Sequence, residues 1–410
     1  MATRTVGPGK DHTTIAAAIL ACNDNPGSRA AMDIVLVDPG TYNEMLDCRA
    51  TSGGWLIPCI VRAADATNMP IITSTGAAQA VRADANYRGT AVGELTLEDL
   101  IFSGWSGTGN GVIYTNSTGL IVRRCKFTGC TNSRTIRTIK GSASRFGLVD
   151  SCEFVTSGAT TGLIVGDSAY TDVINCKAIC PTNVPFYSDL GGASRYIEHN
   201  SILGTWNSAG GTDVITVTGG TARGNIAQNL GTGGRYGIYE WGAGNYIENI
   251  FYGSFTTRFY GTDGGGNQNV DPLFSNTGSG TENLSLQSTS PAIGALARSA
   301  NTLLDILGFT RSDPTDAGAY MYVSANAWSA FGSDTFASVS GDFTINRNLN
   351  LSGHWKKRSG LSLAQNGANA VTQVPFSLGT PGPASLRGRN KPYAQTTNTS
   401  ASNTPGSQGF

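Results

Sequence analysis

The chain has 410 residues, a formal net charge of +0 at pH 7 and only 14% charged residues. The chain as a whole therefore has no excess positive charge that would attract nucleic acid or an anionic membrane. No apolar run approaches the roughly 18 residues that a membrane-spanning helix needs. With 54 glycines and no long helix-forming run, the composition is typical of a β-rich chain with many turns.

The first apolar stretch is IAAAILAC, from Ile15 to Cys22. Asp11 and His12 precede it, and no clean small-residue cleavage site follows, so it does not have the pattern of a secretory signal peptide. We therefore expect synthesis in the cytoplasm without Sec export. The eight cysteines are thinly spread over a long chain that needs no covalent staples, so reduced thiols are expected.

A segment recurs every 24 to 27 residues through the middle of the chain. Aligning the repeats gives one column of Leu100, Cys125, Cys152, Cys176, Asn200, Asn225 and Asn249. Mostly apolar residues stand three positions earlier (Leu97, Val122, Val149, Val173, Ile197, Ala222, Tyr246) and two positions later (Phe102, Phe127, Phe154, Ala178, Ile202, Ala227, Phe251). Such columns predict a solenoid in which each repeat forms one coil and equivalent side chains stack about 4.8 Å apart.

The central column is predicted to be an internal ladder of cysteines continued by asparagines. Buried cysteine behaves as a small hydrophobe, and stacked asparagine amides hydrogen-bond along the axis. A linear stack of thiols does not supply the four converging ligands of a zinc site, so no metal is expected. Cys130 and Cys180, which sit just after two ladder positions, receive the same interpretation.

Two further rows are predicted to face outward. Glu98, Arg123, Asp150, Ile174, Glu198 and Arg223 stand two positions before the ladder, and Lys126, Glu153 and Lys177 stand one position after it. The signs alternate, as expected for surface charges that lie opposite one another on adjacent strands. This arrangement explains most carboxylates of the region without catalysis.

With these repeats, the chain resembles the right-handed parallel β-helix proteins of the pectin-lyase-like group. VGPGKDHTTIAAAI from Val6 is similar to their opening, in which a short amphipathic helix plugs the first coil, with Ile15 and Ile19 facing inward here. IVLVDPGTYNE from Ile34 is similar to their first strand and turn, and VDPLF, LSLQSTSPAIGAL and DILGFTRSDPTDAGAYMY are similar to their last coils and closing segment. The resemblance spans about residues 5 to 322.

The resemblance implies an all-β fold, a right-handed, single-stranded parallel β-helix with an N-terminal capping helix. After residue 322 the apolar residues are scattered and the polar tracts long, which predicts an extended, mostly irregular C-terminal arm. We expect residues 1–30 to form the N-terminal segment and cap, residues 31–322 the helix with its closing segment, and residues 323–410 a polar arm for attachment or oligomer contact. The same fold carries pectate lyases, polygalacturonases, bacteriophage tailspikes, adhesins and capsid-surface proteins, so it does not specify function.

The C-terminal region differs from the rest in charge. Residues 323–410 contain seven basic and two acidic side chains, a net charge of about +5 that leaves about −5 on the helix. The basic segments WKKRSG and LRGRNKPY are short and far apart, which favours an arm that folds onto an acidic protein partner over one that binds nucleic acid.

A search for catalytic residues finds no pectate lyase or polygalacturonase motif. The carboxylates outside the alternating rows include Asp167, Asp172, Asp189, Asp213, Glu240, Glu248 and Asp263. Glycosidase chemistry would need two of them about 5 to 9.5 Å apart. His12, His199 and His354 are the only histidines and suggest no Ser-His-Asp set. TDGGGNQNVD, from Thr262, has the glycines and acids of a calcium loop, but turn formation explains it equally and is favoured.

One aromatic-rich segment, residues 236–260, has no simple structural explanation. The ladder places Tyr246 and Phe251 inside, so some of its other aromatic residues are expected to face out. Exposed aromatic side chains on a β-helix stack on sugar rings or pack against a neighbouring subunit. Subunit or core packing is favoured, and the candidate contact residues for glycan or subunit are Tyr239, Glu240, Trp241, Tyr252 and Phe255.

These observations favour a bacteriophage virion structural protein over an enzyme. In this hypothesis the β-helix is displayed on a capsid or tail appendage, held to other virion proteins through residues 323–410, and forms a homo-oligomer such as a trimer. No cofactor, metal or membrane contact is expected, and host polysaccharide is a candidate ligand. The alternatives are a tailspike-type depolymerase, acting as a polysaccharide lyase or glycoside hydrolase, and a carbohydrate-binding adhesin without turnover.

Overall fold

The computed structural model divides into two compact units, Met1–Tyr322 and Val323–Phe410. In the first unit it describes residues 1–23, 31–49, 57–73, 79–83, 94–106, 111–116, 119–131, 134–139, 146–155, 162–167, 170–189, 196–207, 212–240, 242, 244–299 and 302–322. In the second unit it describes four short strands: β31 (Ala337–Val339), β32 (Asp342–Thr344), β33 (Ser362–Leu363) and β34 (Val374–Pro375). β31 pairs with β32 and β33 with β34, both antiparallel.

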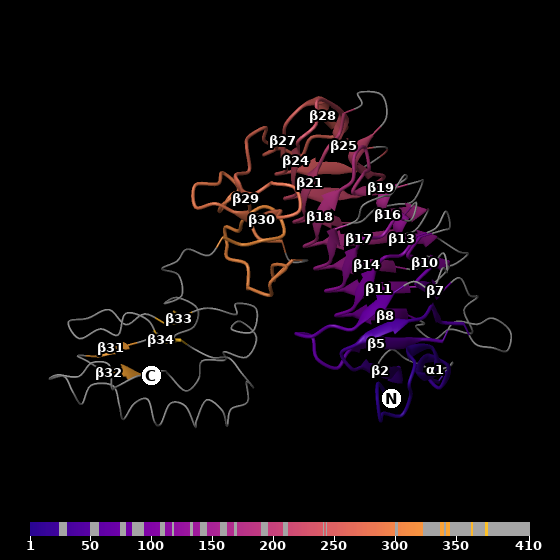
Figure 1. Ribbon diagram of the computed structural model, residues 1–410. Coiled ribbons are helices and arrows are strands. Elements are labelled where there is room, and N and C mark those ends of the chain that lie inside the picture. Colours follow the sequence, from indigo (N-terminus) through magenta and orange to yellow (C-terminus); the bar gives the residue numbers. More distant parts are fainter. Residues whose placement is uncertain are drawn as a thin grey trace. The chain divides into compact units, whose positions relative to one another are not determined.

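The first unit is a parallel β-helix, as the repeats predict (Figure 1). Each coil contributes one strand to each of three sheets in turn, and strands of successive coils pair in parallel. Sheet 1 consists of β1 (Thr3–Val6), β2 (Asp33–Val37), β5 (Cys59–Ala63), β8 (Glu94–Glu98), β11 (Gly119–Arg123), β14 (Phe146–Asp150), β17 (Tyr170–Ile174), β20 (Tyr196–Glu198), β23 (Thr221–Arg223) and β26 (Asn245–Ile247).

The other two sheets follow the same order along the axis. Sheet 2 consists of β3 (Thr41–Asn43), β6 (Ile71–Thr73), β9 (Ile101–Ser103), β12 (Lys126–Thr128), β15 (Glu153–Val155), β18 (Lys177–Cys180), β21 (Ser201–Gly204), β24 (Ile226–Asn229) and β27 (Ile250–Tyr252). Sheet 3 consists of β4 (Leu46–Asp47), β7 (Val81–Ala83), β10 (Ile113–Asn116), β13 (Arg134–Ile139), β16 (Gly162–Asp167), β19 (Tyr187–Asp189), β22 (Asp213–Val217), β25 (Gly234–Glu240) and β28 (Phe255–Tyr260).

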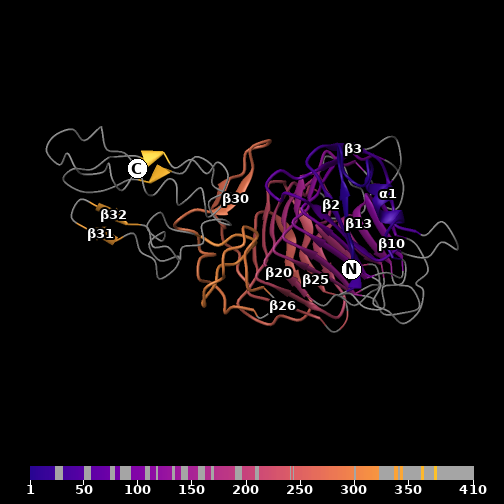
Figure 2. The same cartoon turned by 90° about the horizontal axis from the view of Figure 1, so that it is seen from below.

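A short helix, α1 (Ile15–Leu20), covers the first coil and contacts β1, β2 and β4 (Figure 2). Its buried face contains Ile15 and Ile19, as the sequence predicts. Thr14 is the N-cap, and its hydroxyl accepts a hydrogen bond from the Ala17 N–H. The Glu44 carboxylate accepts the Ile15 and Ala16 N–H groups at 2.8 and 2.9 Å, so the helix end is tied to the first coil.

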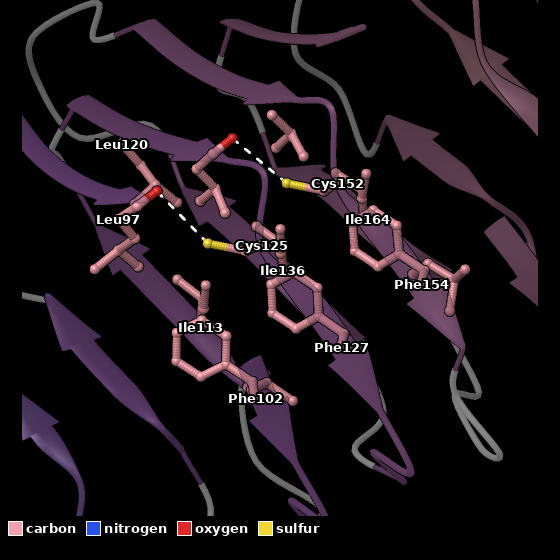
Figure 3. Close-up of a cluster of buried hydrophobic side chains, with 14 of the residues drawn as sticks. Leu97, Phe102, Ile113, Leu120, Cys125, Phe127, Ile136, Cys152, Phe154 and Ile164 are labelled. Atoms are coloured by element: carbon pink, nitrogen blue, oxygen red, sulfur yellow. Dashed lines mark hydrogen bonds between the residues drawn. The ribbon is translucent and has the colours of Figure 1, made fainter. Parts of the chain in front are cut away.

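The interior consists of stacked columns, and the two flanking rows predicted to be apolar are buried (Figure 3). Phe102, Phe127 and Phe154 stack face to face, with ring centroids 5.2 and 5.0 Å apart. This spacing follows from the parallel register, which places equivalent residues of successive coils directly opposite one another. Each coil therefore depends mainly on its two neighbours for burial of its apolar side chains.

The predicted ladder is confirmed, and its cysteine and asparagine parts share one acceptor position. The Cys125 thiol donates to the Leu97 carbonyl of the preceding coil at 3.6 Å (Figure 3). Asn225 Nδ2 donates to the equivalent carbonyl, that of Ile197, at 2.7 Å. Ladder cysteines and asparagines thus satisfy the same backbone group, and the asparagines add amide-to-amide bonds along the axis.

We expect the ladder thiols to be inert. Burial raises the pKa of Cys125 and Cys152, so the reactive thiolate is disfavoured. In the native protein neither should react with a thiol reagent, and Cys152→Ala should lower the free energy of unfolding by about 1 to 3 kcal/mol through a small cavity. Rapid labelling of native Cys152, or stoichiometric zinc in the purified protein, would contradict this interpretation.

The predicted alternation of surface charges is confirmed in the middle coils. It is wrong toward the C-terminal end of the β-helix. Arg123 lies between Glu98 and Asp150 at 3.9 and 3.6 Å, and Lys126 pairs with Glu153 at 3.5 Å. Glu198, by contrast, is only 2% exposed. Its carboxylate accepts a hydrogen bond from the Ser299 hydroxyl, which belongs to the end of the first unit and covers this coil.

This covering element, residues 270–322, is here called the closing segment. It contains the hairpin β29 (Phe274–Asn276) and β30 (Asn283–Leu286) and lies beside β21 and β24 (Figure 1). Leu203, Ile226 and Ile250 of sheet 2 pack outward against its apolar side chains, forming a second hydrophobic core. The segment therefore folds back along the outside of the helix, and the outward positions that it covers are apolar instead of charged.

Candidate functional site

Three tyrosines that are exposed or half-buried gather at the C-terminal end of sheet 3. Tyr239 of β25 lies opposite Tyr260 of β28 in the parallel register, and their rings stack with centroids 5.2 Å apart. The Tyr236 ring lies 5.1 Å from Tyr239 and 5.2 Å from Tyr260. These three residues, here called the tyrosine cluster, form a continuous aromatic surface, and Tyr260 is 49% exposed.

A guanidinium–carboxylate pair borders the tyrosine cluster. The Arg235 guanidinium lies 5.1 Å from the Tyr236 ring centroid and 5.6 Å from that of Tyr239. It donates two hydrogen bonds to the Asp213 carboxylate, at 2.8 and 2.7 Å. These hydrogen bonds raise the pKa of Arg235, which keeps its positive charge fixed beside the rings. The site therefore offers aromatic faces and an oriented guanidinium within one small area.

Two glycines of β25 lie against phenylalanine rings at the end of the core. A Cβ at Gly237 would come within 2.5 Å of Phe251 Cδ1, and one at Gly234 within 2.9 Å of Phe255 Cδ1. The absence of side chains at these positions leaves room for the phenylalanine rings that close the end of the core. Phe255 and Phe259 accordingly pack against the interior cluster, and Phe259 stacks on Tyr246 at 5.4 Å.

The five predicted contact residues are not brought together. Tyr239 belongs to the tyrosine cluster, whereas Tyr252 is exposed on sheet 2. Phe255 packs inward, and Trp241 lies outside the described residues. Glu240 is buried: its carboxylate accepts the Gly244 N–H at 2.9 Å and the Thr262 N–H at 3.0 Å. It therefore orders two turns and presents no free oxygen at the surface.

The sequence prediction missed Tyr236, Tyr260, Arg235 and Asp213 as partners of Tyr239. One signal for part of this group was present. Tyr239 and Tyr260 are 21 residues apart, close to one coil, so the repeat could have placed them opposite each other. The ring contacts of Tyr236 and the pairing of Arg235 with Asp213 depend on local strand geometry, which the repeat does not specify.

The other carboxylates considered for catalysis have structural partners. Asp213 pairs with Arg235, Glu248 with Arg223 at 2.9 Å, and Asp172 accepts the Tyr196 N–H at 3.1 Å. Asp189 is buried at 6% exposure and is also engaged with a partner. The Asp167 side chain lies outside the described residues.

The glycine-rich loop after Thr262 continues the ladder. Asn267 Oδ1 accepts the Asn249 side-chain amide at 3.0 Å, and the Asn267 amide donates to Asp263 Oδ1 at 2.6 Å. Asp263 Oδ1 also accepts the Gly265 N–H at 2.7 Å. The turn interpretation of this loop accounts for its acid and its glycines. In the part of the chain that the structure describes, no group of three or more His, Cys, Asp or Glu residues is arranged to hold a metal ion.

Comparison with known proteins adds little to this geometry. No family model matches the chain, and no curated protein matches its sequence. Six solved chains match its structure. The crystal structure of the pectin methylesterase from Aspergillus niger in deglycosylated form aligns with 66% of this chain and 86% of its own, at 14% sequence identity and a TM-score of 0.30. Such an alignment carries no argument about activity, and the parallel β-helix is established by the strand pairing itself.

The described residues also contain no helix that is long and apolar enough to cross a membrane.

Proposed function

We propose that this protein is a bacteriophage virion component that displays its β-helix on a capsid or tail appendage and binds host-surface glycans at the tyrosine cluster. Residues 323–410 attach it to other virion proteins. The observation that carries the proposal is the mutually stacked set of half-buried Tyr236 and Tyr239 with exposed Tyr260, beside the Arg235–Asp213 pair.

The chemistry of this surface suits a sugar. The flat apolar faces of a pyranose ring pack on aromatic rings, and its hydroxyl groups need donors and acceptors at the rim of the contact. Arg235, whose side chain is 37% exposed, supplies donors at the rim, and the buried Asp213 carboxylate fixes the orientation of the guanidinium through their mutual hydrogen bonds. Because the site is held by paired strands, little ordering is needed when a glycan binds.

Attachment through the C-terminal region is supported by charge. Residues 323–410 have a net charge of about +5, and a basic arm is attracted to an acidic partner surface. The chain divides into Met1–Tyr322 and Val323–Phe410, which allows the two parts to have different roles.

A glycan array carrying bacterial capsular polysaccharides and O-antigens tests the binding site. The wild-type chain should bind at least one glycan, and Tyr239→Ala combined with Tyr260→Ala should lower its affinity by about tenfold or more, because two stacking surfaces are lost. Tyr252→Ala is the matched control, since Tyr252 is 37% exposed but lies on sheet 2, and it should bind like the wild type.

Three results would overturn this assignment. Equal binding by the double variant and the wild type would place the glycan elsewhere. A change of oligomeric state in the double variant, without a change in glycan binding, would make the tyrosine cluster a contact between copies of the chain. Release of reducing ends or unsaturated sugars from a bound polysaccharide would favour the depolymerase alternative.

A truncated chain tests attachment. Residues 1–322 should fold without the arm, because each coil depends on its neighbours and the closing segment is retained. Circular dichroism should therefore show an intact β-helix, whereas particles assembled with the truncated chain in place of the full chain should lack it. Normal incorporation of residues 1–322 would refute the attachment role. The glycan array tests the binding site independently of this experiment.

A further inference from the structure

The closing segment is docked on the helix through a buried polar contact centred on Arg311, whose side chain is 1% exposed. The guanidinium donates to Asn175 Oδ1 of the helix at 2.9 Å and to the carbonyls of Asp316 and Gly318 at 3.1 and 2.8 Å. Burial lowers the pKa of Arg311 to about 10, so it is still charged at neutral pH. A positive charge is thus fixed inside the interface between the closing segment and the helix.

A second titratable side chain, His199, is buried in the same interface. Its backbone lies in the left-handed region with φ 54°, at the turn from sheet 1 to sheet 2, in line with Asn175 of the preceding coil at φ 55°. The side chain is 0% exposed, and neither ring nitrogen makes a hydrogen bond of normal geometry to any described residue. A Cβ added at Gly224 would lie 3.3 Å from the ring and 2.5 Å from Leu296 of the closing segment, so the ring is enclosed between the two elements.

The charges around His199 come from both elements. Arg223 of the next coil and Arg311 of the closing segment disfavour a proton on the ring, and they add to the larger effect of burial, so that the pKa of His199 lies well below its usual value. The backbone of Asp316 favours the proton and is outweighed.

The acidic side chains near His199 bind groups other than its ring. Glu248 pairs with Arg223 and Glu198 accepts from Ser299. The Asp316 carboxylate accepts backbone N–H groups of Gly294 and Tyr322, and the Asp305 carboxylate accepts those of Leu307, Phe309 and Met321.

We propose that protonation of His199 releases the closing segment from the helix in mildly acidic solution and uncovers the apolar outer face of sheet 2 formed by Leu203, Ile226 and Ile250. In the docked state the ring is neutral, because it has no acidic partner and faces two guanidinium groups. In the undocked state it is solvated and takes up a proton readily. Acid therefore favours the undocked state, and the surface that becomes exposed is the second hydrophobic core.

The direction follows from proton linkage. A histidine whose pKa is lowered on docking binds fewer protons in the docked state, so docking weakens as the pH falls below the ordinary value of about 6.5, by up to about tenfold per pH unit. Burial raises the pKa of Asp305 and Asp316, so the docked state binds their protons more readily. These two carboxyl groups therefore favour docking as the pH falls, which is opposite to the effect of His199. Release is thus expected between about pH 6.5 and the range in which the carboxyl groups titrate.

Hydrogen exchange of the full chain tests the proposal. The Gly318 N–H donates to the Gly224 carbonyl at 2.7 Å and the Ala319 N–H to Ser201 Oγ at 2.9 Å, so both report docking. Their protection factors, corrected for intrinsic exchange, should fall about tenfold per pH unit below pH 6.5. The amides of Ser201 and Ile226, which pair within the helix, should keep their protection.

His199→Asn should abolish this pH dependence, because asparagine adopts the same left-handed backbone at position 175 and does not titrate. His12→Asn is the matched control and should behave like the wild type. Unchanged protection of Gly318 and Ala319 in the wild type between pH 7.5 and 5.0 would overturn the proposal whether or not the variant folds. Equal pH dependence in wild type and His199→Asn would also overturn it.

Discussion

Replacing Asn225 with alanine is expected to lower the free energy of unfolding of the helix by about 3 to 5 kcal/mol. Its Oδ1 accepts the Asn200 N–H and side-chain amide at 3.2 and 2.9 Å, and its Nδ2 donates to the Ile197 carbonyl and to Asn249 Oδ1 at 2.7 and 2.9 Å. Alanine leaves several of these buried groups without a partner, at a cost of about 1 to 3 kcal/mol each. Urea unfolding followed by the fluorescence of buried Trp206 measures the change.

Asn225→Cys is the matched control for this prediction. A thiol at a ladder position donates to the same backbone carbonyl, as Cys152 does to Val122 at 3.6 Å, but it does not replace the amide oxygen. The cysteine variant should therefore lose less stability than the alanine variant. A loss below about 1 kcal/mol in the alanine variant would mean that water or a shifted amide satisfies the ladder, and would contradict the role assigned to Asn225.

Arg311→Met is expected to detach the closing segment at neutral pH. The substitution fills a similar volume but removes three hydrogen bonds from a buried guanidinium, one of them to the Asn175 side chain 136 positions away in the sequence. Methionine leaves the three buried acceptor oxygens without a donor, at a cost of about 1 to 3 kcal/mol each. Limited proteolysis should cut within residues 290–322 much faster than in the wild type.

Arg298→Met is the control, because Arg298 lies on the same segment but is exposed, and its side chain donates to the Arg311 carbonyl at 3.2 Å. Its proteolysis should match that of the wild type, since exposed substitutions of this kind usually change stability by less than about 0.5 kcal/mol. Equal resistance of Arg311→Met and Arg298→Met would show that the apolar contacts of Leu203, Ile226 and Ile250 are sufficient to hold the segment.

The candidate site shows how far a repeat predicts side-chain positions. The coil period could have placed Tyr239 opposite Tyr260, and it correctly placed Tyr246 and Phe251 inside. It did not predict that Gly234 and Gly237 leave room for Phe255 and its neighbours, or that Glu240 turns inward to bind two backbone N–H groups. These positions lie in the last two coils of sheet 3, where the strand β28 ends the stack.

The sequence by itself determined the β-helix and the ladder, because in a parallel stack one period of the chain corresponds to one position in space, whereas the capping helix was implied by the family resemblance. A cysteine such as Cys125 and an asparagine such as Asn225 could be placed inside from their spacing alone. Only the tertiary structure decided the burial of Glu198 and His199. Glu198 accepts a hydrogen bond from Ser299, which is 101 residues later in the sequence, and the charge of Arg311 acts on the His199 ring; neither partner belongs to the repeat.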